Sequence, residues 1–188
     1  MRKDIRFSGI GGQGVVLASQ ILAEAAGVYQ GLHAVQTQFY GYAIRGGPST
    51  GDVVISSEPV TYPWVQRADV FVAMAQSALD TGWKDVKPDG LVIVDSVYVT
   101  QLPAGLKAKS CVAPITLLSD EAGTRKAINI VMLGVFTRLT GIVTYEALEK
   151  AVLARVPKGT EKVNLKALQL GFSVDPAKLP GRPAPVQA

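Results

Sequence analysis

Five short runs with strand patterns, separated in several places by segments of helical spacing, constrain the fold of this chain of 188 residues more than any other feature. The runs are DIRFSGI at 4–10, HAVQTQF at 33–39, GDVVISS at 51–57, ADVFVAM at 68–74 and GLVIVDS at 90–96. Strands that alternate with helices build a mostly parallel sheet covered on both faces. The last two runs are almost continuously apolar, which is typical of strands buried on both sides. The sequence therefore predicts an α/β fold, a three-layer Rossmann-like single domain.

The connection between the second and third runs predicts that the sheet is mixed. Residues 40–51, YGYAIRGGPSTG, are too few and too rich in glycine for a crossover helix. We therefore expect a loop here, followed by an antiparallel edge strand.

The second half of the chain is predicted to be helical. Thr116 is placed to cap a short helix that Gly123 ends. The apolar helix that follows, in RKAINIVMLGVFTRLTG, is ended by Gly141. Thr144 and Thr160 stand where two further helices would start. The expected organisation is one domain over residues 1–172 and a proline-rich tail over 173–188 that is disordered or laid along a partner.

Composition excludes several classes of protein. The net charge of +4 is spread along the chain without a basic run, so nucleic acid is not an expected ligand. One cysteine and one histidine cannot hold a structural zinc or an iron-sulfur cluster by themselves. The longest apolar run, AINIVMLGVF at 127–136, is much shorter than the roughly 20 residues that a membrane helix needs. We expect a cytoplasmic protein without a membrane partner.

The first glycine-rich turn is a candidate binding site. In RFSGIGGQGVVLAS, residues 6–19, a strand leads through Gly9, Gly11, Gly12 and Gly14 into a helix. Glycine lets the backbone approach a ligand closely, and the N–H groups at a helix start favour a phosphate. The Gln13 amide can donate to such a ligand or cap the backbone. The alternative is a tight connection that binds nothing.

A nicotinamide cofactor is the less favoured ligand. Dinucleotide-binding turns place an acidic residue about 20 residues further on, against the ribose. Here no Asp or Glu lies between Glu24 and Asp52, although Arg45 could face a 2′-phosphate. The same Arg45 could clamp another phosphate or a carboxylate, or brace its loop on an aspartate of this chain.

Three other polar residues are interpreted as structural. His33 has no second ligand nearby, and Cys111 lies in an apolar stretch where it is expected to be buried and unreactive. Asn129, in the apolar helix, needs a partner once it is buried, so it braces the backbone or contacts another subunit. No catalytic set can be assembled from these residues. The chain offers a binding surface without catalytic machinery, as a subunit of a larger enzyme would.

Several motifs in a fixed order carry a family resemblance. They are GIGGQGVVLASQILAEAA, QTQFYGYAIRGGPSTGDVVISSEPVTYP, ADVFVAMAQSALD, GLVIVDS, NIVMLG and NLKALQLGF. In this order they resemble the gamma subunit of 2-oxoacid:ferredoxin oxidoreductases, which include pyruvate, 2-oxoglutarate, ketoisovalerate and aryl-oxoacid enzymes. The resemblance runs over about residues 2–172.

The resemblance implies an assisting subunit of an oxidative decarboxylase. Thiamine diphosphate and iron-sulfur clusters would lie on partners, the alpha and beta subunits and a ferredoxin-like subunit. Together they would convert a 2-oxoacid and coenzyme A to acyl-CoA and carbon dioxide, and pass electrons to ferredoxin or a similar acceptor. This chain would bind no cofactor alone and carry no catalytic residue.

In fused members of the family the equivalent domain is associated with coenzyme A. The residues expected near it are Gly9, Gly11, Gly12, Gln13, Gly14, Arg45, Gly46 and Gly47.

One departure from the family pattern leaves the substrate open. Many members have a glutamate before RGG, where this chain has Ala43 and Ile44. A bulkier and less polar oxoacid, such as an aryl glyoxylate or indolepyruvate, is therefore permitted. Two alternatives to the complex are a stand-alone NAD(P)-binding oxidoreductase and an assembly module whose glycine turn holds no ligand.

Overall fold

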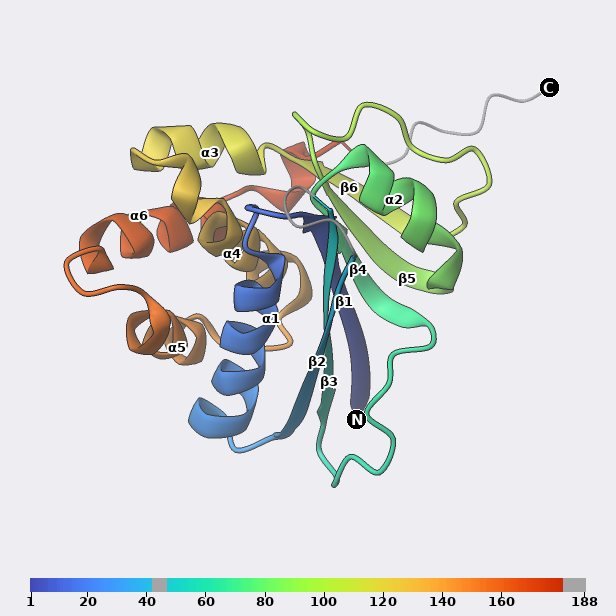
Figure 1. The fold of residues 1–188 in the computed structure, drawn as a ribbon, viewed down its shortest axis with the longest axis horizontal. Coiled ribbons are helices and arrows are strands. Elements are labelled where there is room, and N and C mark those ends of the chain that lie inside the picture. The colour runs from blue at the N-terminus through green and yellow to red at the C-terminus, as the bar shows by residue number, and fades with distance from the viewer. Residues whose placement is uncertain (42–46, 181–188) are drawn as a thin grey trace.

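The computed structural model describes residues 1–41 and 47–180. Its strands are β1 (Arg2–Ile10), β2 (His33–Tyr40), β3 (Pro48–Ser56), β4 (Ala68–Ala73), β5 (Val86–Asp95) and β6 (Lys109–Ala113). They form one sheet in the order β2-β3-β1-β4-β5-β6 (Figure 1). The neighbours β1, β4, β5 and β6 are parallel, whereas β3 is antiparallel to both β1 and β2. The predicted α/β fold with a mostly parallel, mixed sheet is confirmed.

The sequence predicted an antiparallel strand at the edge of the sheet, and this position is wrong. β3 lies between β2 and β1, and the edge strand is β2. Val53, Val54 and Ile55 are fully buried, which is typical of a strand covered on both faces of the sheet. The predicted loop is also shorter than expected, since Pro48 already pairs with Ile10 as the first residue of β3.

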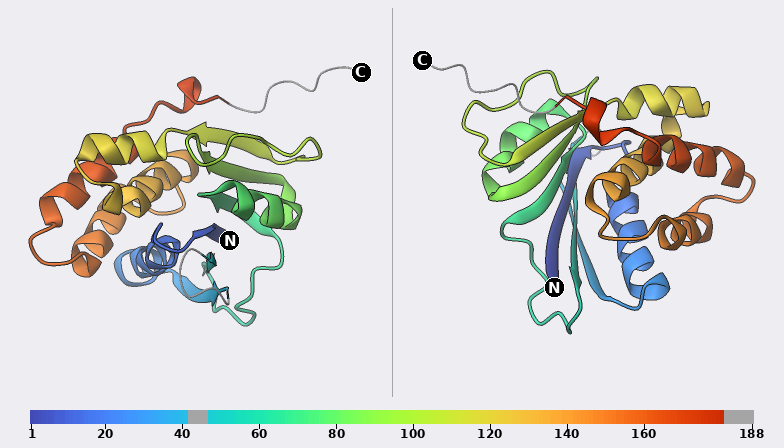
Figure 2. Two further views of the ribbon diagram at one scale, coloured as in Figure 1. Left: turned by 45° about the horizontal axis from the view of Figure 1, so that its top comes forward. Right: turned by 180° about the vertical axis from the view of Figure 1, so that it is seen from behind.

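The helices lie on both sides of the sheet. They are α1 (Val15–Glu24), α2 (Gln76–Gly82), α3 (Ile115–Ala122), α4 (Ile128–Thr140), α5 (Tyr145–Arg155) and α6 (Glu161–Phe172). Figures 1 and 2 show α1 and α3 to α6 gathered on one side and α2 on the other. The three-layer arrangement is therefore present, with the thinner layer made by α2 and its connecting segments.

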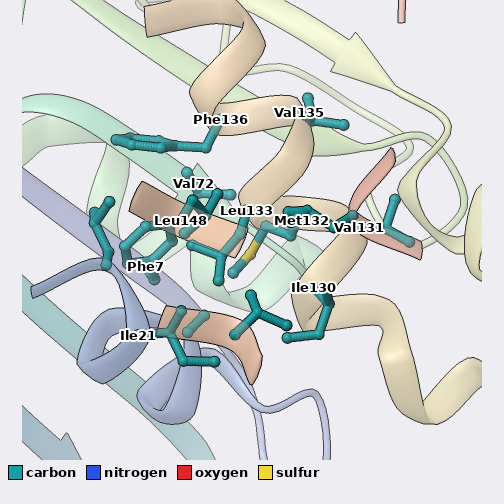
Figure 3. Packing of buried hydrophobic residues seen from close by; sticks show 14 of the residues in the cluster. Phe7, Ile21, Val72, Ile130, Val131, Met132, Leu133, Val135, Phe136 and Leu148 are labelled. Carbon is teal, nitrogen blue, oxygen red and sulfur yellow. The ribbon is translucent and has the colours of Figure 1, made fainter. Parts of the chain in front are cut away.

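The larger core lies between the sheet and α4, the helix that is buried over nearly its whole length. Phe7 of β1 and Phe136 of α4 meet there with ring centroids 5.5 Å apart (Figure 3). Gly134 of α4 and Gly171 of α6 allow the two helices to touch, because a Cβ at either position would overlap the backbone of the other helix. Gly141, with φ of 60°, ends α4 as predicted.

Two local expectations in this region need correction. β6 was not predicted, because its sequence KSCVA is short and only partly apolar. Thr116 is not a helix cap but lies inside α3, where its backbone N–H and its hydroxyl each donate to the buried Asp95 over 2.8 Å. Asp95 thus ties the end of β5 to the start of α3. The predicted helix start at Thr144 is confirmed: Thr144 is the N-cap of α5, and its hydroxyl accepts from the Ala147 N–H.

The described part of the predicted tail lies on this chain. The Val112 N–H of β6 donates to the Pro180 carbonyl over 3.0 Å, and Val174 and Leu179 pack against the core. Pro180 therefore lies at the outer edge of β6, and the rest of the tail lies outside the described residues. Among the helices of the described ranges, none has the length and apolar character that crossing a bilayer requires.

Candidate functional site

A cavity of about 680 Å³ opens where β1 ends and α1 begins. Gly11, Gly12 and Gly14 of the first glycine turn line one side of it. The opposite side is lined by the segments that flank the second glycine-rich loop, Tyr40–Gly41 and Gly47–Ser49. This volume is within the range of small-molecule and cofactor sites. The structure thus brings the two predicted loops to one cavity.

The backbone of the turn has the conformation that its glycines were expected to provide. Gly12 and Gly14 have φ of 99° and 70°, in the left-handed region that favours glycine. Gly14 is also the N-cap of α1, and Val15, Val16 and Leu17 of the first helical turn line the cavity. The Gly11 N–H donates to the Gly47 carbonyl over 2.9 Å, which fixes the two loops against each other. The α1 dipole therefore presents partial positive charge to the cavity.

Gln13 does not line the cavity; its side chain is buried beneath the turn. Its Oε1 accepts from the Ile10 N–H over 2.9 Å, and its Nε2 donates to the Met74 carbonyl over 2.7 Å. A Cβ at Gly9 would overlap that Oε1, so Gly9 makes room for the amide. Of the two roles considered for Gln13, the structure shows the backbone brace, which joins the turn to the end of β4.

Asn129 of α4 supports the turn from the core side. Its Nδ2 donates to the Gly14 carbonyl over 3.4 Å. A Cβ at Gly14 would lie 2.9 Å from the Asn129 amide, so contact with Asn129 and the positive φ both require glycine there. The expectation that Asn129 braces the backbone is confirmed.

No residue that lines the described part of the cavity is charged. Arg45 and Gly46, two of the predicted site residues, lie outside the described residues, so their role stays a prediction. The polar groups of the described lining are backbone groups and the side chains of Gln20, Tyr40 and Ser49. Sequence reasoning missed these three residues, although Tyr40 and Ser49 flank the predicted loop directly.

The remaining candidates show no reactive site. Burial raises the pKa of the Cys111 thiol to about 11, so it stays protonated at neutral pH, as its interpretation as a buried small residue requires. His33 is exposed at the start of β2. Within residues 1–41 and 47–180, no three His, Cys, Asp or Glu side chains come together as a metal site would require.

Comparisons with known proteins agree with this fold. Residues 4–174 match the family described as pyruvate ferredoxin/flavodoxin oxidoreductase. The 2-oxoglutarate synthase subunit KorC of Methanocaldococcus jannaschii is 47% identical over 176 residues, which cover 93% of this chain and 94% of that subunit. The gamma subunit of a keto/oxoacid ferredoxin oxidoreductase from Geobacter sulfurreducens has a crystal structure with a TM-score of 0.83 at 43% identity, over 92% of this chain and 95% of that one.

A longer polypeptide shares the fold at lower sequence identity. It is the 2-oxoglutarate:ferredoxin oxidoreductase of Magnetococcus marinus, solved with 2-oxoglutarate, coenzyme A and succinyl-CoA bound. The TM-score is 0.81 at 21% identity, and the match covers 93% of this chain but only 32% of that polypeptide. The same architecture thus occurs as a separate subunit and as part of a longer chain.

Proposed function

The chain belongs to the pyruvate ferredoxin/flavodoxin oxidoreductase family as a gamma-type subunit of 2-oxoacid:ferredoxin oxidoreductases, and from this premise we propose that its glycine-turn cavity holds part of coenzyme A. We further propose that the complex acts on 2-oxoglutarate. The reaction converts 2-oxoglutarate and coenzyme A to succinyl-CoA and carbon dioxide, and transfers two electrons to ferredoxin. In this proposal thiamine diphosphate and iron-sulfur clusters belong to the alpha, beta and ferredoxin-like subunits.

One observation carries the coenzyme A proposal: the cavity combines a helix N-terminus, two left-handed glycines and a lining without a carboxylate among its described residues. A pyrophosphate is an anion that such a backbone site stabilises without a basic side chain of its own. Arg45 stands in the sequence between Gly41 and Gly47, which both line this cavity, and we propose that it supplies the cation for a further phosphate. The gamma-type fold also occurs within a polypeptide that was solved with coenzyme A.

The lack of an acidic ribose partner separates coenzyme A from a nicotinamide. No Asp or Glu lies between Glu24 and Asp52, which is where a dinucleotide-binding domain carries its acidic residue. A thiol-bearing ligand anchored by its phosphates needs no such residue. In this role the chain would bind and orient the acyl acceptor, and thiamine diphosphate on a partner subunit would supply the decarboxylation chemistry.

Arg45→Ala in the assembled complex tests the proposal. We expect KM for coenzyme A to rise by about tenfold while kcat and KM for the oxoacid stay unchanged, because one charge-assisted contact is lost from binding alone. Arg67→Ala is the matched control, since Arg67 is exposed and lines grooves away from the glycine turn. An unchanged KM in a normally assembled complex would remove Arg45 from the site.

The substrate proposal depends on the 47% identity to a 2-oxoglutarate synthase subunit. We expect kcat/KM of the purified complex to be highest for 2-oxoglutarate, above pyruvate, 2-oxoisovalerate and indolepyruvate. A preference for indolepyruvate would support the less polar oxoacid that Ala43 and Ile44 permit. We place the complex in the cytoplasm, a reducing compartment that a single buried cysteine suits.

Titration of the isolated chain separates the two alternative functions. A stand-alone oxidoreductase would bind NADH or NADPH and turn over without partners. A ligand-free assembly module would bind neither nucleotide, and substitutions at the turn would change assembly without changing KM for coenzyme A.

A further inference from the structure

β2 is an edge strand without the usual protection against pairing. It runs for eight residues, HAVQTQFY, with no proline, lysine, arginine or carboxylate. Among the described residues its only strand neighbour is β3, so alternate backbone N–H and C=O groups point away from the sheet. Natural edge strands are usually short, charged, interrupted by proline or covered. A long and uncharged edge therefore indicates a surface that another strand covers.

The opposite edge of the same sheet shows the expected protection. β6 has five residues, begins with Lys109, and its Val112 N–H is taken by the Pro180 carbonyl. The left view of Figure 2 shows β6, in yellow-green, and β2, in light blue, at opposite ends of the sheet. Within residues 1–41 and 47–180, Pro180 thus lies on the β6 edge, whereas no further strand lies on the β2 edge.

Large apolar side chains flank the open edge on both faces of the sheet. Tyr40, 59% exposed, lies on the α1 side, and Phe39, 58% exposed, lies on the other side beside Thr50. Val28 is 70% exposed and lines a groove of about 560 Å³ together with Ala34 and Gln36 of β2. Exposed apolar residues grouped in this way mark an interaction surface.

We propose that β2 pairs with β2 of a second copy of this chain, antiparallel and about a two-fold axis at Thr37. An axis perpendicular to the sheet keeps the helical layer of both copies on one side, so residues that point to the same face must lie opposite each other. The Thr37 register does this for every pair. It opposes Thr37 with Thr37, Gln36 with Gln38, Val35 with Phe39, and Ala34 with Tyr40.

The chemistry of these pairs favours a second copy. Threonine pairs and aromatic pairs with β-branched residues stabilise cross-strand contacts, and no like charges meet. The continuous sheet would satisfy the open edges of both copies at once. This inference goes beyond the proposed function and does not depend on it, because it concerns two copies of one subunit and not a ligand.

Charge variants at Thr37 test the pairing. We expect sedimentation of the full chain to show a dimer of the 19.9 kDa protomer, and Thr37→Lys and Thr37→Glu each to give monomers, because like charges then meet at the axis. An equimolar mixture of the two variants should recover dimers, since lysine and glutamate then lie opposite each other. Thr100→Lys, at an exposed threonine away from β2, is the matched control and should stay dimeric.

The mixture separates pairing from folding, because a misfolded variant is not rescued by its opposite charge. A wild-type chain that stays monomeric at every concentration overturns the proposal. So does a dimer that both single variants retain. If the chain is monomeric and Thr37→Lys fails to join the complex while it binds coenzyme A normally, a strand of another subunit covers this edge. That result would leave the coenzyme A proposal intact.

Discussion

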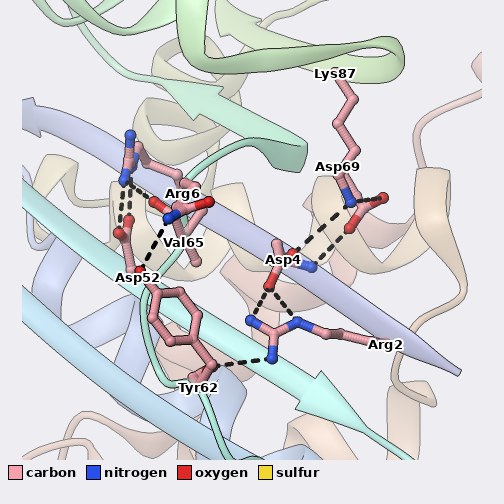
Figure 4. Close-up of polar contacts among 9 residues, drawn as sticks. Arg2, Asp4, Arg6, Asp52, Tyr62, Val65, Asp69 and Lys87 are labelled. Atoms are coloured by element: carbon pink, nitrogen blue, oxygen red, sulfur yellow. Dashed lines mark hydrogen bonds and ion pairs between the residues drawn. The ribbon is translucent and has the colours of Figure 1, made fainter.

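At the end of the sheet where β1 begins, charged side chains hold neighbouring strands together. The Lys87 Nζ lies 2.9 Å from Asp69, and Asp69 accepts from the backbone N–H of Asp4 over 2.8 Å (Figure 4). Further along β1, Arg6 forms a two-point contact with Asp52 on β3, with both distances 2.8 Å. These charges are paired with one another, so they attract a charged ligand only weakly.

At the end where β1 finishes, the contacts are uncharged. Gln13, Asn129 and the Gly11–Gly47 hydrogen bond hold the turn, and the positive end of α1 has no carboxylate of the described lining against it. A helix N-terminus without a bound carboxylate stabilises an anionic ligand, whereas the charges of an ion pair already neutralise each other within the fold. The comparison indicates that the ion pairs of this chain serve its stability, and the uncharged end is where we propose that coenzyme A binds.

The largest effect on stability should come from Gly14→Ala, a substitution at the uncharged end of the sheet. We expect a loss of about 3 kcal/mol in the free energy of unfolding, of which roughly 1–2 comes from a left-handed alanine and the rest from overlap with Asn129. Urea denaturation of the chain measures it. In Gly14→Ala with Asn129→Ala the overlap disappears, so the two changes together should cost less than their sum. Strict additivity would show that Asn129 does not restrict this position.

The next largest effect should come from Asp52→Ala, at the charged end. Arg6 and Asp52 have side chains only 18% and 12% exposed, so removing the carboxylate leaves a half-buried guanidinium with weaker partners. We expect a loss of about 2 kcal/mol, measured by urea denaturation.

The double variant Arg6→Met with Asp52→Leu is the control for that result. It should restore most of the stability, because two apolar side chains replace the pair without leaving a charge behind. KM for coenzyme A should be unchanged in both variants. A raised KM would contradict the division of roles between the two ends.

The sequence predicts those features of the fold that depend on residues close together in the chain. The strands of the parallel half and the helix ended by Gly141 follow from apolar runs and a glycine stop, both of which act within a few residues. The predicted place of β3 was wrong because the position of a strand in the sheet depends on its pairing, here with β1 and β2. The apolar residues 53–55 do indicate burial on both faces of the sheet. β6 was missed because its pairing partner β5, and not its own composition, makes it a strand.

The site divides in the same way. The turn and its glycines could be predicted, because glycines between a strand and a helix are a local pattern. That the second glycine-rich loop lies near the turn was expected only from the family resemblance, since Gly11 and Gly47 are far apart in the sequence. The direction of the Gln13 side chain could not be derived, since its amide donates to Met74, which follows the distant strand β4. Thr116 was assigned as a cap from its position alone, whereas its buried partner Asp95 lies 21 residues earlier.

Gln13→Met should have a smaller effect on stability than the first two changes. Methionine keeps the volume of the side chain but lacks the amide, so the Ile10 N–H and the Met74 carbonyl lose their hydrogen-bond partner. Because Ile10 is only half-buried, water can replace part of what is lost there. We expect a loss of about 1.5 kcal/mol by urea denaturation. Because Gln13 positions the turn, KM for coenzyme A should rise while kcat is unchanged. Gln20→Met, on the cavity wall, should leave stability unchanged, and equal losses for both would contradict the brace.

The smallest effect should come from Asp120→Asn, at an ion pair of α3 that lies in water. A hydrogen bond from Arg125 lowers the pKa of Asp120 below its ordinary value of 3.8, so the folded chain favours the ionised carboxylate. Its contribution to stability is therefore present above pH 3.8 and is lost as the pH falls through the lowered folded pKa. Thermal unfolding at pH 6 should place the wild type slightly above Asp120→Asn, and the difference should vanish in acid. A difference as large as that of Asp52→Ala would mean that exposure does not decide the strength of the ion pairs in this chain.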